Sequence, residues 1–212
     1  MPIATVLYDR FTALDAVGPY ELLSRLPGAQ TVVCAEERGP VRSDTGVLGI
    51  TADACLEEVR APDIVLVPGG PGQGLLMEHE PLLEWLRAVD TTATWMTTVC
   101  TGSLLLAAAG LLRGRPATTH WAAMEALSAY GAVPTPERVV RDGRYVTAAG
   151  VSAGIDMALE LCGRIEGEEF AQALQLAVEY DPQPPFSAGS PGKAPEHLVR
   201  MLRESPEKIL GG

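Results

Sequence analysis

The sequence predicts an α/β fold: a three-layer, flavodoxin-like arrangement in which helices cover both faces of a mostly parallel sheet. Short apolar and β-branched runs alternate with longer helix-forming segments along the chain, and that alternation is typical of strands joined by crossover helices. The 212 residues are 47% hydrophobic and 20% charged, which is the composition of a compact domain. A cysteine at a strand-to-helix junction further predicts a nucleophile elbow after a central strand.

The first half of the chain is expected to hold a helix early and a fully apolar strand near its end. Asp15 is expected to cap the helix, and Pro19 lies in its first turn, where proline is tolerated. The apolar strand ends in the loop Pro68–Gly72, whose backbone can approach a ligand closely. In order, the expected elements are a strand at 3–8, a helix at 15–26, a strand at 30–34, a hairpin or two short strands at 41–51, a strand at 63–67 and a helix at 81–89.

The second half is expected to contain one clear hairpin and an irregular tail. Asp142-Gly143 between two short β-branched runs is a strong hairpin signal, and residues 181–195 are rich in Pro, Gly and Ser. One domain is predicted over residues 1–212, with the segment 181–212 packing on it. In order, the expected elements are a strand leading into Cys100, a helix ending near Gly110, a helix at 120–130, paired strands at 139–140 and 145–147, helices at 154–163 and 168–180, and a short helix at 195–203.

Cys100 is the main candidate for a catalytic residue. Residues 93–99 are β-branched and aromatic, whereas Leu104–Ala109 are strong helix formers. A sharp turn between them would expose the central side chain, and the N-terminal end of the new helix favours a thiolate. The pattern therefore predicts an exposed nucleophile with a lowered pKa. Thr98 stands where the elbow pattern has its first glycine, so the match is partial.

The alternative interpretation is that Cys100 is a buried packing residue, as many cysteines are. The other three cysteines give no sign of a disulfide framework or a zinc site, because the chain has no C-x-x-C pair. Cys34 and Cys162 lie on apolar stretches and are expected in the core. Cys55 has no activating neighbour. We therefore expect neither a metal nor an organic cofactor.

Charge and hydropathy exclude several classes of partner. The net charge of −11 opposes binding to nucleic acid, because an acidic surface repels phosphate groups. The N-terminal residues lack the positive region and cleavage site of a signal peptide. The longest apolar run, Leu104–Leu112, is far too short to span a bilayer. The expected location is the cytoplasm, without a membrane partner.

Segments whose residues could take part in a reaction follow three of the predicted strands. They are the turn with Asp15, the Gly69-Gly70 loop and the elbow at Cys100. Ligands of parallel α/β sheets bind at the carboxyl ends of strands, so these segments are expected at one edge of the sheet. For Asp15 a plain helix cap stays an alternative. His120 could pair with Cys100, although its place at a helix start favours a structural role.

The order of apolar strand, glycine-rich loop and cysteine elbow resembles the ThiJ/PfpI superfamily over nearly the whole chain, and within it the isocyanide hydratases. Protease-like and glyoxalase-like relatives have a histidine after the cysteine or a glutamate in the first loop, where this chain has Thr101 and Asp15. Ala149 departs from the resemblance, because glycines are expected there. The elbow and the Thr-Thr-His-Trp run also occur in sensor domains of transcription regulators. The matching segments are 14–21, 67–72, 99–103, 117–121, 153–156 and 180–191.

The resemblance implies that Cys100 is the nucleophile, Asp15 the essential acid and Thr101 an active-site threonine. It implies addition of water to a small-molecule isocyanide, through a thioimidate on Cys100, to give an N-substituted formamide. It also implies a homodimer without a cofactor. The backbone N–H groups of Gly70 and Thr101 are expected to hold the intermediate or the attacking water.

Two other functions use the same cysteine. A glyoxalase or deglycase would form a hemithioacetal between Cys100 and a reactive carbonyl compound. A non-enzymatic sensor would bind a ligand or be oxidised at Cys100 to the sulfinic acid.

Overall fold

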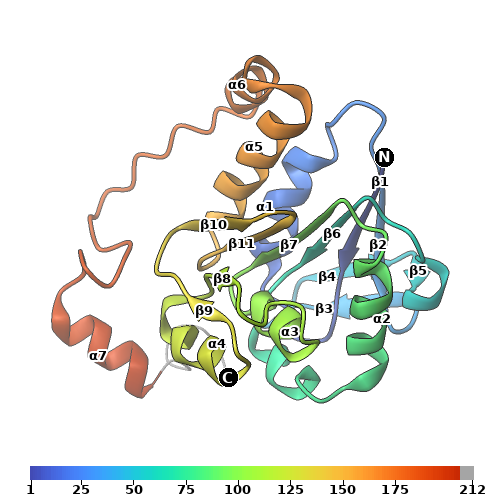
Figure 1. The fold of residues 1–212 in the computed structure, drawn as a ribbon. Helices are drawn as coiled ribbons and strands as arrows, with labels where there is room; N and C mark the ends of the chain where they lie inside the picture. The colour runs from blue at the N-terminus through green and yellow to red at the C-terminus, as the bar shows by residue number, and fades with distance from the viewer. Residues whose placement is uncertain (206–212) are drawn as a thin grey trace.

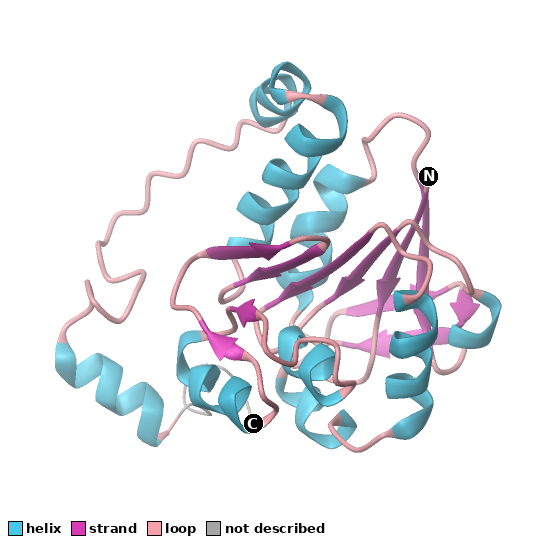
Figure 2. Cartoon of the chain, in the orientation of Figure 1, coloured by secondary structure: helices cyan, strands magenta, loops and turns pink. Residues whose placement is uncertain are grey.

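The computed structural model of the protein describes residues 1–205. Its centre is a seven-stranded sheet with the order β10-β11-β7-β6-β1-β2-β5 (Figure 1). All neighbours in this sheet are parallel except β10 and β11, which form the antiparallel hairpin predicted around Asp142-Gly143. Helices lie on both faces of the sheet (Figure 2), so the predicted three-layer α/β fold is confirmed.

The elements agree with the sequence pattern in kind and differ mainly at their ends. The strands are β1 (Pro2–Val6), β2 (Gln30–Ala35), β3 (Gly39–Arg42), β4 (Gly49–Ala52), β5 (Ala54–Cys55), β6 (Ile64–Val67), β7 (Trp95–Val99), β8 (Pro116–Ala117), β9 (Val133–Pro134), β10 (Val139–Asp142) and β11 (Tyr145–Ala148). The helices are α1 (Ala13–Leu23), α2 (Glu80–Asp90), α3 (Gly102–Ala108), α4 (Met124–Ala129), α5 (Ala153–Glu166), α6 (Glu168–Ala177) and α7 (Glu196–Glu204).

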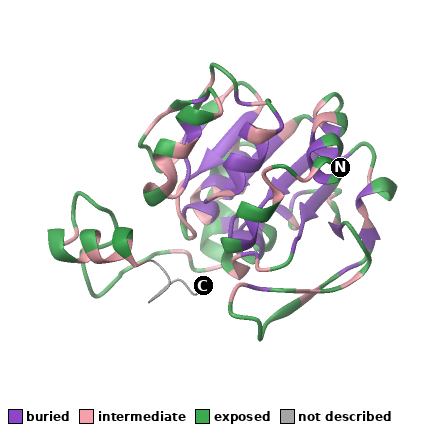
Figure 3. Cartoon of the chain, turned by 90° about the horizontal axis from the view of Figure 1, so that it is seen from below, coloured by how far each residue is buried: buried purple, intermediate pink, exposed green. Residues whose placement is uncertain are grey.

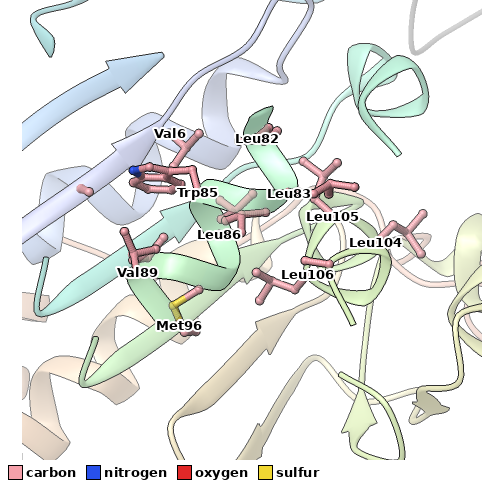
Figure 4. Packing of buried hydrophobic residues seen from close by; sticks show 14 of the residues in the cluster. Val6, Leu82, Leu83, Trp85, Leu86, Val89, Met96, Leu104, Leu105 and Leu106 are labelled. Carbon is pink, nitrogen blue, oxygen red and sulfur yellow. The ribbon is translucent and has the colours of Figure 1, made fainter. Parts of the chain in front are cut away.

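Side chains of β1 alternate between two hydrophobic clusters, as the period of a strand requires. Ile3 packs with residues of α1 and α5 on one face of the sheet. Ala4 and Val6 pack on the other face, in the cluster that holds the apolar sides of α2 and α3 (Figure 4). Burial on both faces explains why β6 is apolar throughout. The sheet is therefore a rigid base for the loops at its edge.

The expected helix at 120–130 is shorter than the sequence indicates. A single 3₁₀ turn, Trp121–Ala123, precedes α4. The 3₁₀ turn begins at His120, whose ring accepts a hydrogen bond from the Ala122 N–H. His120 therefore caps the 3₁₀ turn, and α4 begins only after that turn. This arrangement favours the structural role predicted for His120.

The C-terminal segment lies apart from the sheet as an arm. Residues 181–195 have no regular structure, as predicted, and nearly all of them are exposed (Figure 3). Helix α7 has no buried residue, and the Arg203 guanidinium lies 5.6 Å from the centre of the Trp121 ring. That the arm packs on the domain stays a prediction. Residues 206–212 of the predicted domain lie outside the described residues.

Candidate active site

Cys100 occupies the turn between β7 and α3 in a left-handed backbone conformation. Its φ is 57°, a region that costs a non-glycine residue roughly 1–2 kcal/mol. The Cys100 N–H donates to the carbonyl oxygens of Ala148 and Ala149 at 3.0 Å each, so the turn is fixed to the end of β11. The predicted sharp strand-to-helix turn is therefore present in the backbone, without a glycine at position 98, whereas the nucleophilic role of Cys100 stays a prediction.

The elbow and the Pro68–Gly72 loop approach each other so closely that two glycines are required. A Cβ at Gly69 would lie 2.5 Å from the Thr101 nitrogen, and a Cβ at Gly102 would lie 2.2 Å from the Val67 oxygen. Neither distance is possible between real atoms, because backbone groups cannot move aside as a flexible side chain can. The motif glycines thus hold the two loops in contact at the carboxyl ends of β6 and β7.

Asp15 points into this contact and does not cap its helix. Its side chain is 0% exposed, and Oδ2 accepts a hydrogen bond of 2.9 Å from the Gly69 N–H. The residue at the N-cap of α1 is Thr12, whose hydroxyl donates to Asp44. The capping role considered for Asp15 is therefore wrong: the carboxyl reaches across to the glycine loop. Its second oxygen, Oδ1, is buried and has no hydrogen-bond partner among residues 1–205.

Asp15 and Cys100 lie close enough for each to shift the pKa of the other. Burial raises the pKa of Asp15 to about 7, against hydrogen bonds from Gly69 and Cys100 that lower it. Burial and the charge of Asp15 raise the pKa of Cys100 to about 12, against the N–H groups of Thr101 and Val151. The prediction of an exposed thiol with a lowered pKa is wrong, because desolvation at 6% exposure outweighs the dipole of the short helix α3. The resting cysteine is a neutral thiol beside a titratable carboxyl.

Thr101 and Gly70 bond to each other within the site. The Gly70 N–H donates to the Thr101 hydroxyl at 3.1 Å, so this amide is occupied in the resting structure. Gly70 has a φ of 140°, which favours glycine. The Thr101 N–H, in contrast, points to the Cys100 sulfur. The two predicted donors are therefore not equivalent. Of the two, only the Thr101 N–H faces the Cys100 sulfur.

His120 packs against Gly150 beside the elbow and has a local hydrogen-bond partner. Burial lowers the pKa of its ring, and its Nδ1 accepts from the Ala122 N–H at 3.3 Å. The ring rests on Gly150, where a Cβ would come within 2.7 Å of Cδ2. Within residues 1–205 no hydrogen bond joins His120 to Cys100. This arrangement favours the structural role over a Cys–His pair.

Two residues beside the site carry no signal in the sequence. Val151 has a φ of 37°, which is rare for a β-branched residue, and its N–H faces the Cys100 sulfur. Tyr8, two residues after the end of β1, donates its hydroxyl to the Pro68 carbonyl at 2.8 Å and so braces the glycine loop. Both depend on contacts between distant parts of the chain, which no local pattern reports.

The remaining sequence predictions concern the other cysteines and the expected absences. Cys34 and Cys162 are buried as predicted, and Cys55 has a neighbour that the sequence did not suggest, because its thiol donates to Glu58 at 2.9 Å. Among residues 1–205 no three His, Cys, Asp or Glu side chains are placed to hold a metal ion. No helix in the described part has the length and hydropathy needed to cross a membrane.

Known proteins resemble this chain in sequence and in structure. The pattern of the DJ-1/PfpI family matches residues 1–164. The isonitrile hydratase of Pseudomonas putida is 44% identical over 96% of this chain and 89% of its own length. The transcriptional regulator CdhR of Pseudomonas aeruginosa is 33% identical over 66% of this chain but only 41% of its own length.

A crystal structure of a ThiJ/PfpI family protein from Pseudomonas syringae has nearly the same fold. It superposes with a TM-score of 0.94 at 38% identity, covering 99% of this chain and 87% of that one. On the elbow geometry, the family pattern and these relatives together, the chain belongs to the DJ-1/PfpI family.

Proposed function

We propose that this protein is an isocyanide hydratase, an enzyme that adds water to an isocyanide to give an N-substituted formamide. The observation that carries the proposal is the pair formed by a buried thiol and a buried carboxyl. Cys100 and Asp15 each shift the pKa of the other, and within residues 1–205 Asp15 Oδ1 is buried without a hydrogen-bond partner. The likeness to the isonitrile hydratase of Pseudomonas putida supports the same reaction.

The first step joins sulfur to the terminal carbon of the isocyanide. That carbon carries a lone pair and becomes strongly electrophilic once it is protonated. Asp15 takes the proton of the Cys100 thiol and delivers it to the carbon while the C–S bond forms. The product is a thioimidate, R–N=CH–S–Cys100, in which the thiol proton has become the C–H. Because the proton leaves sulfur only as the bond forms, the raised pKa of Cys100 does not prevent attack.

The second step adds water and releases the product. Asp15, again a carboxylate, takes a proton from a water molecule as the water oxygen attacks the same carbon. Asp15 then passes that proton to the nitrogen. The tetrahedral intermediate R–NH–CH(OH)–S–Cys100 collapses when the C–S bond breaks. The hydroxyl proton returns through Asp15 to sulfur, so the net change is the addition of one water. Thr101, through its N–H and hydroxyl, and the Gly70 N–H are the proposed donors to the intermediate.

A homodimer in the cytoplasm is part of the proposal. Surface apolar residues support a partner: Leu14 is 43% exposed and Val17 40% exposed on α1, and α7 buries no residue. Single chains seldom expose such groups together. Light scattering should give twice the chain mass of 22.4 kDa, and a mass equal to one chain would contradict the dimer. Cell fractionation tests the location.

The experiment that tests the activity offers two substrates to one preparation. A simple alkyl isocyanide should be consumed with appearance of the formamide proton signal, whereas methylglyoxal should be turned over poorly. Asp15, one methylene shorter than the glutamate of glyoxalase-like relatives, supports this order. Preferential turnover of methylglyoxal would favour a glyoxalase. Failure with both substrates, with ready oxidation of Cys100 by mild peroxide in mass spectra, would favour a sensor.

A further inference from the structure

The carbonyl group of Cys100 is held by two buried hydroxyls that the reaction scheme does not use. Thr119 Oγ1 donates to this oxygen at 2.9 Å and Ser103 Oγ donates to it at 3.2 Å. Thr119 is 1% exposed and Ser103 is 0% exposed. One donor or one water molecule is enough to satisfy a buried carbonyl oxygen. Two side-chain donors on this oxygen therefore indicate that the direction of the carbonyl group matters.

The direction matters because this carbonyl belongs to the same peptide unit as the Thr101 N–H. A trans peptide is planar, and its C=O and N–H point in opposite directions. The Thr101 N–H is one of two amides, with that of Val151, that face the Cys100 sulfur. Fixing the oxygen on one side therefore fixes the aim of the N–H on the other. A hydroxyl that donates to the C=O also polarises the unit, which strengthens the N–H as a donor.

The two hydroxyls differ in what they are attached to. Ser103 lies three residues after Cys100 in the same turn of α3, so it would follow the peptide if the elbow rotated. Thr119 comes from a distant segment, which is tied to the sheet because the Thr118 N–H donates to the Thr147 hydroxyl at 2.9 Å on β11. Thr119 is thus an external fixed point for a peptide that is held in a strained, left-handed turn.

We propose that Thr119 is a positioning residue: by donating to the Cys100 carbonyl it aims the Thr101 N–H at the sulfur and so sets the reactivity of Cys100. It touches neither the thiol nor the substrate in this scheme. The inference deepens the proposed function, but its main readout is the chemistry of the thiol itself. It can therefore fail or stand whether or not isocyanides are the substrates.

The test compares Thr119→Val, which removes the hydroxyl at nearly constant shape, with Thr119→Ser, which keeps it. The matched control is Thr118→Val, since Thr118 is also 1% exposed and its hydroxyl has only a weak contact of 3.9 Å with Met124. For each protein, the rate of alkylation of Cys100 by iodoacetamide is followed by mass spectrometry over a pH series. Isocyanide turnover is measured alongside.

Thr119→Val should move the alkylation profile to higher pH and lower kcat about tenfold, as loss of one buried hydrogen bond would, with little change in KM. Thr119→Ser should restore both, and Thr118→Val should match the unmodified protein. Wild-type alkylation and turnover in Thr119→Val, or equal losses in Thr118→Val, would overturn the proposal. If Thr119→Val does not fold, Thr119→Ala replaces it with the same expected results. If Thr119→Val shifts the alkylation profile but the unmodified protein does not turn over isocyanides, the proposed substrate is wrong and the role of Thr119 still holds.

Discussion

Cys34 lies within strand β2 and Cys100 in the turn after strand β7 of the same sheet, and the two thiols have nearly the same pKa. Both are buried, at 0% and 6% exposure, and burial raises the pKa of each thiol to about 12. Acidity and exposure therefore do not distinguish a packing cysteine from a candidate nucleophile in this protein. A search for a lowered thiol pKa would have passed over both.

What distinguishes the two regions is the backbone and one carboxyl. Cys34 lies within the regular strand β2, pairs with Val6 in register, and has burial as the sole cause of its raised pKa. Cys100 stands in a left-handed turn beside the unpartnered Oδ1 of Asp15. Under the proposed mechanism, the reactivity of Cys100 therefore depends on where the thiol proton can go rather than on how easily it leaves into water.

Replacing Cys100 by Ser should have the largest effect of any single change. A serine keeps the size but lacks a nucleophile that the Asp15 carboxyl can deprotonate, so formamide production should fall roughly 10⁴-fold or more. The measurement is the formamide signal from an alkyl isocyanide, with thermal unfolding as the control for folding. Retained turnover in Cys100→Ser would remove Cys100 from the mechanism altogether.

Asp15→Asn should have the next largest effect. The amide keeps an oxygen for the Gly69 N–H but cannot carry the proton, so kcat should fall about 10²–10³-fold. Asp44→Asn is the matched control: Asp44 accepts from the Thr12 hydroxyl, and its charge is the smallest of the causes that shift the pKa of Asp15, so this variant should turn over isocyanide at close to the normal rate. Full activity in Asp15→Asn would mean that the carboxyl only braces the glycine loop.

The stability of the protein should carry a signature of the same carboxyl. The folded pKa of Asp15, about 7, lies above the ordinary value of 3.8 for this carboxyl group, so the folded state binds the proton more tightly than the unfolded state. Its contribution is complete below about pH 4 and is lost as pH rises through about 7, at about 1.4 kcal/mol for each unit of the shift. Urea denaturation should thus show the free energy of unfolding falling over this window.

In Asp15→Asn this fall should be absent or much reduced, which separates Asp15 from the other acids. The kcat/KM of the unmodified enzyme should run in the opposite direction and rise with pH through about 7, because the carboxyl must be free to take the thiol proton. A turnover profile that is flat across that range would show that Asp15 does not titrate in the rate-limiting step.

Much of this site could be predicted from local sequence. The apolar strand before Pro68, the glycines at 69, 70 and 102, and the change from β-branched to helix-forming residues around Cys100 each report a backbone requirement that falls within a few residues. Their convergence followed from the rule that parallel strands end at one edge. The turn at Cys100 and the glycine loop were predicted in this way, whereas the acid role proposed for Asp15 came from the family resemblance.

The rest depends on contacts that the order of residues does not contain. The helix start predicted at Asp15 lies at Ala13, so the acid turns inward to Gly69 instead of capping. Desolvation by neighbouring elements reverses the predicted direction of the Cys100 pKa shift. Thr119 belongs to a segment recognised only by resemblance, and its bond to the Cys100 carbonyl spans 19 residues. Propensities and spacing cannot report any of these three.

Cys34→Ala should have the smallest effect on activity and so tests the comparison from its other side. Removing a buried sulfur leaves a small cavity in β2 and should lower the free energy of unfolding by about 1–2 kcal/mol. Turnover per folded molecule should stay within the error of the assay, since no carboxyl and no strained turn accompany this thiol. Urea denaturation and formamide production measured on one preparation separate the two quantities. A loss of turnover without loss of stability would mean that packing around Cys34 affects Cys100 through the sheet. The two cysteines would then not be independent.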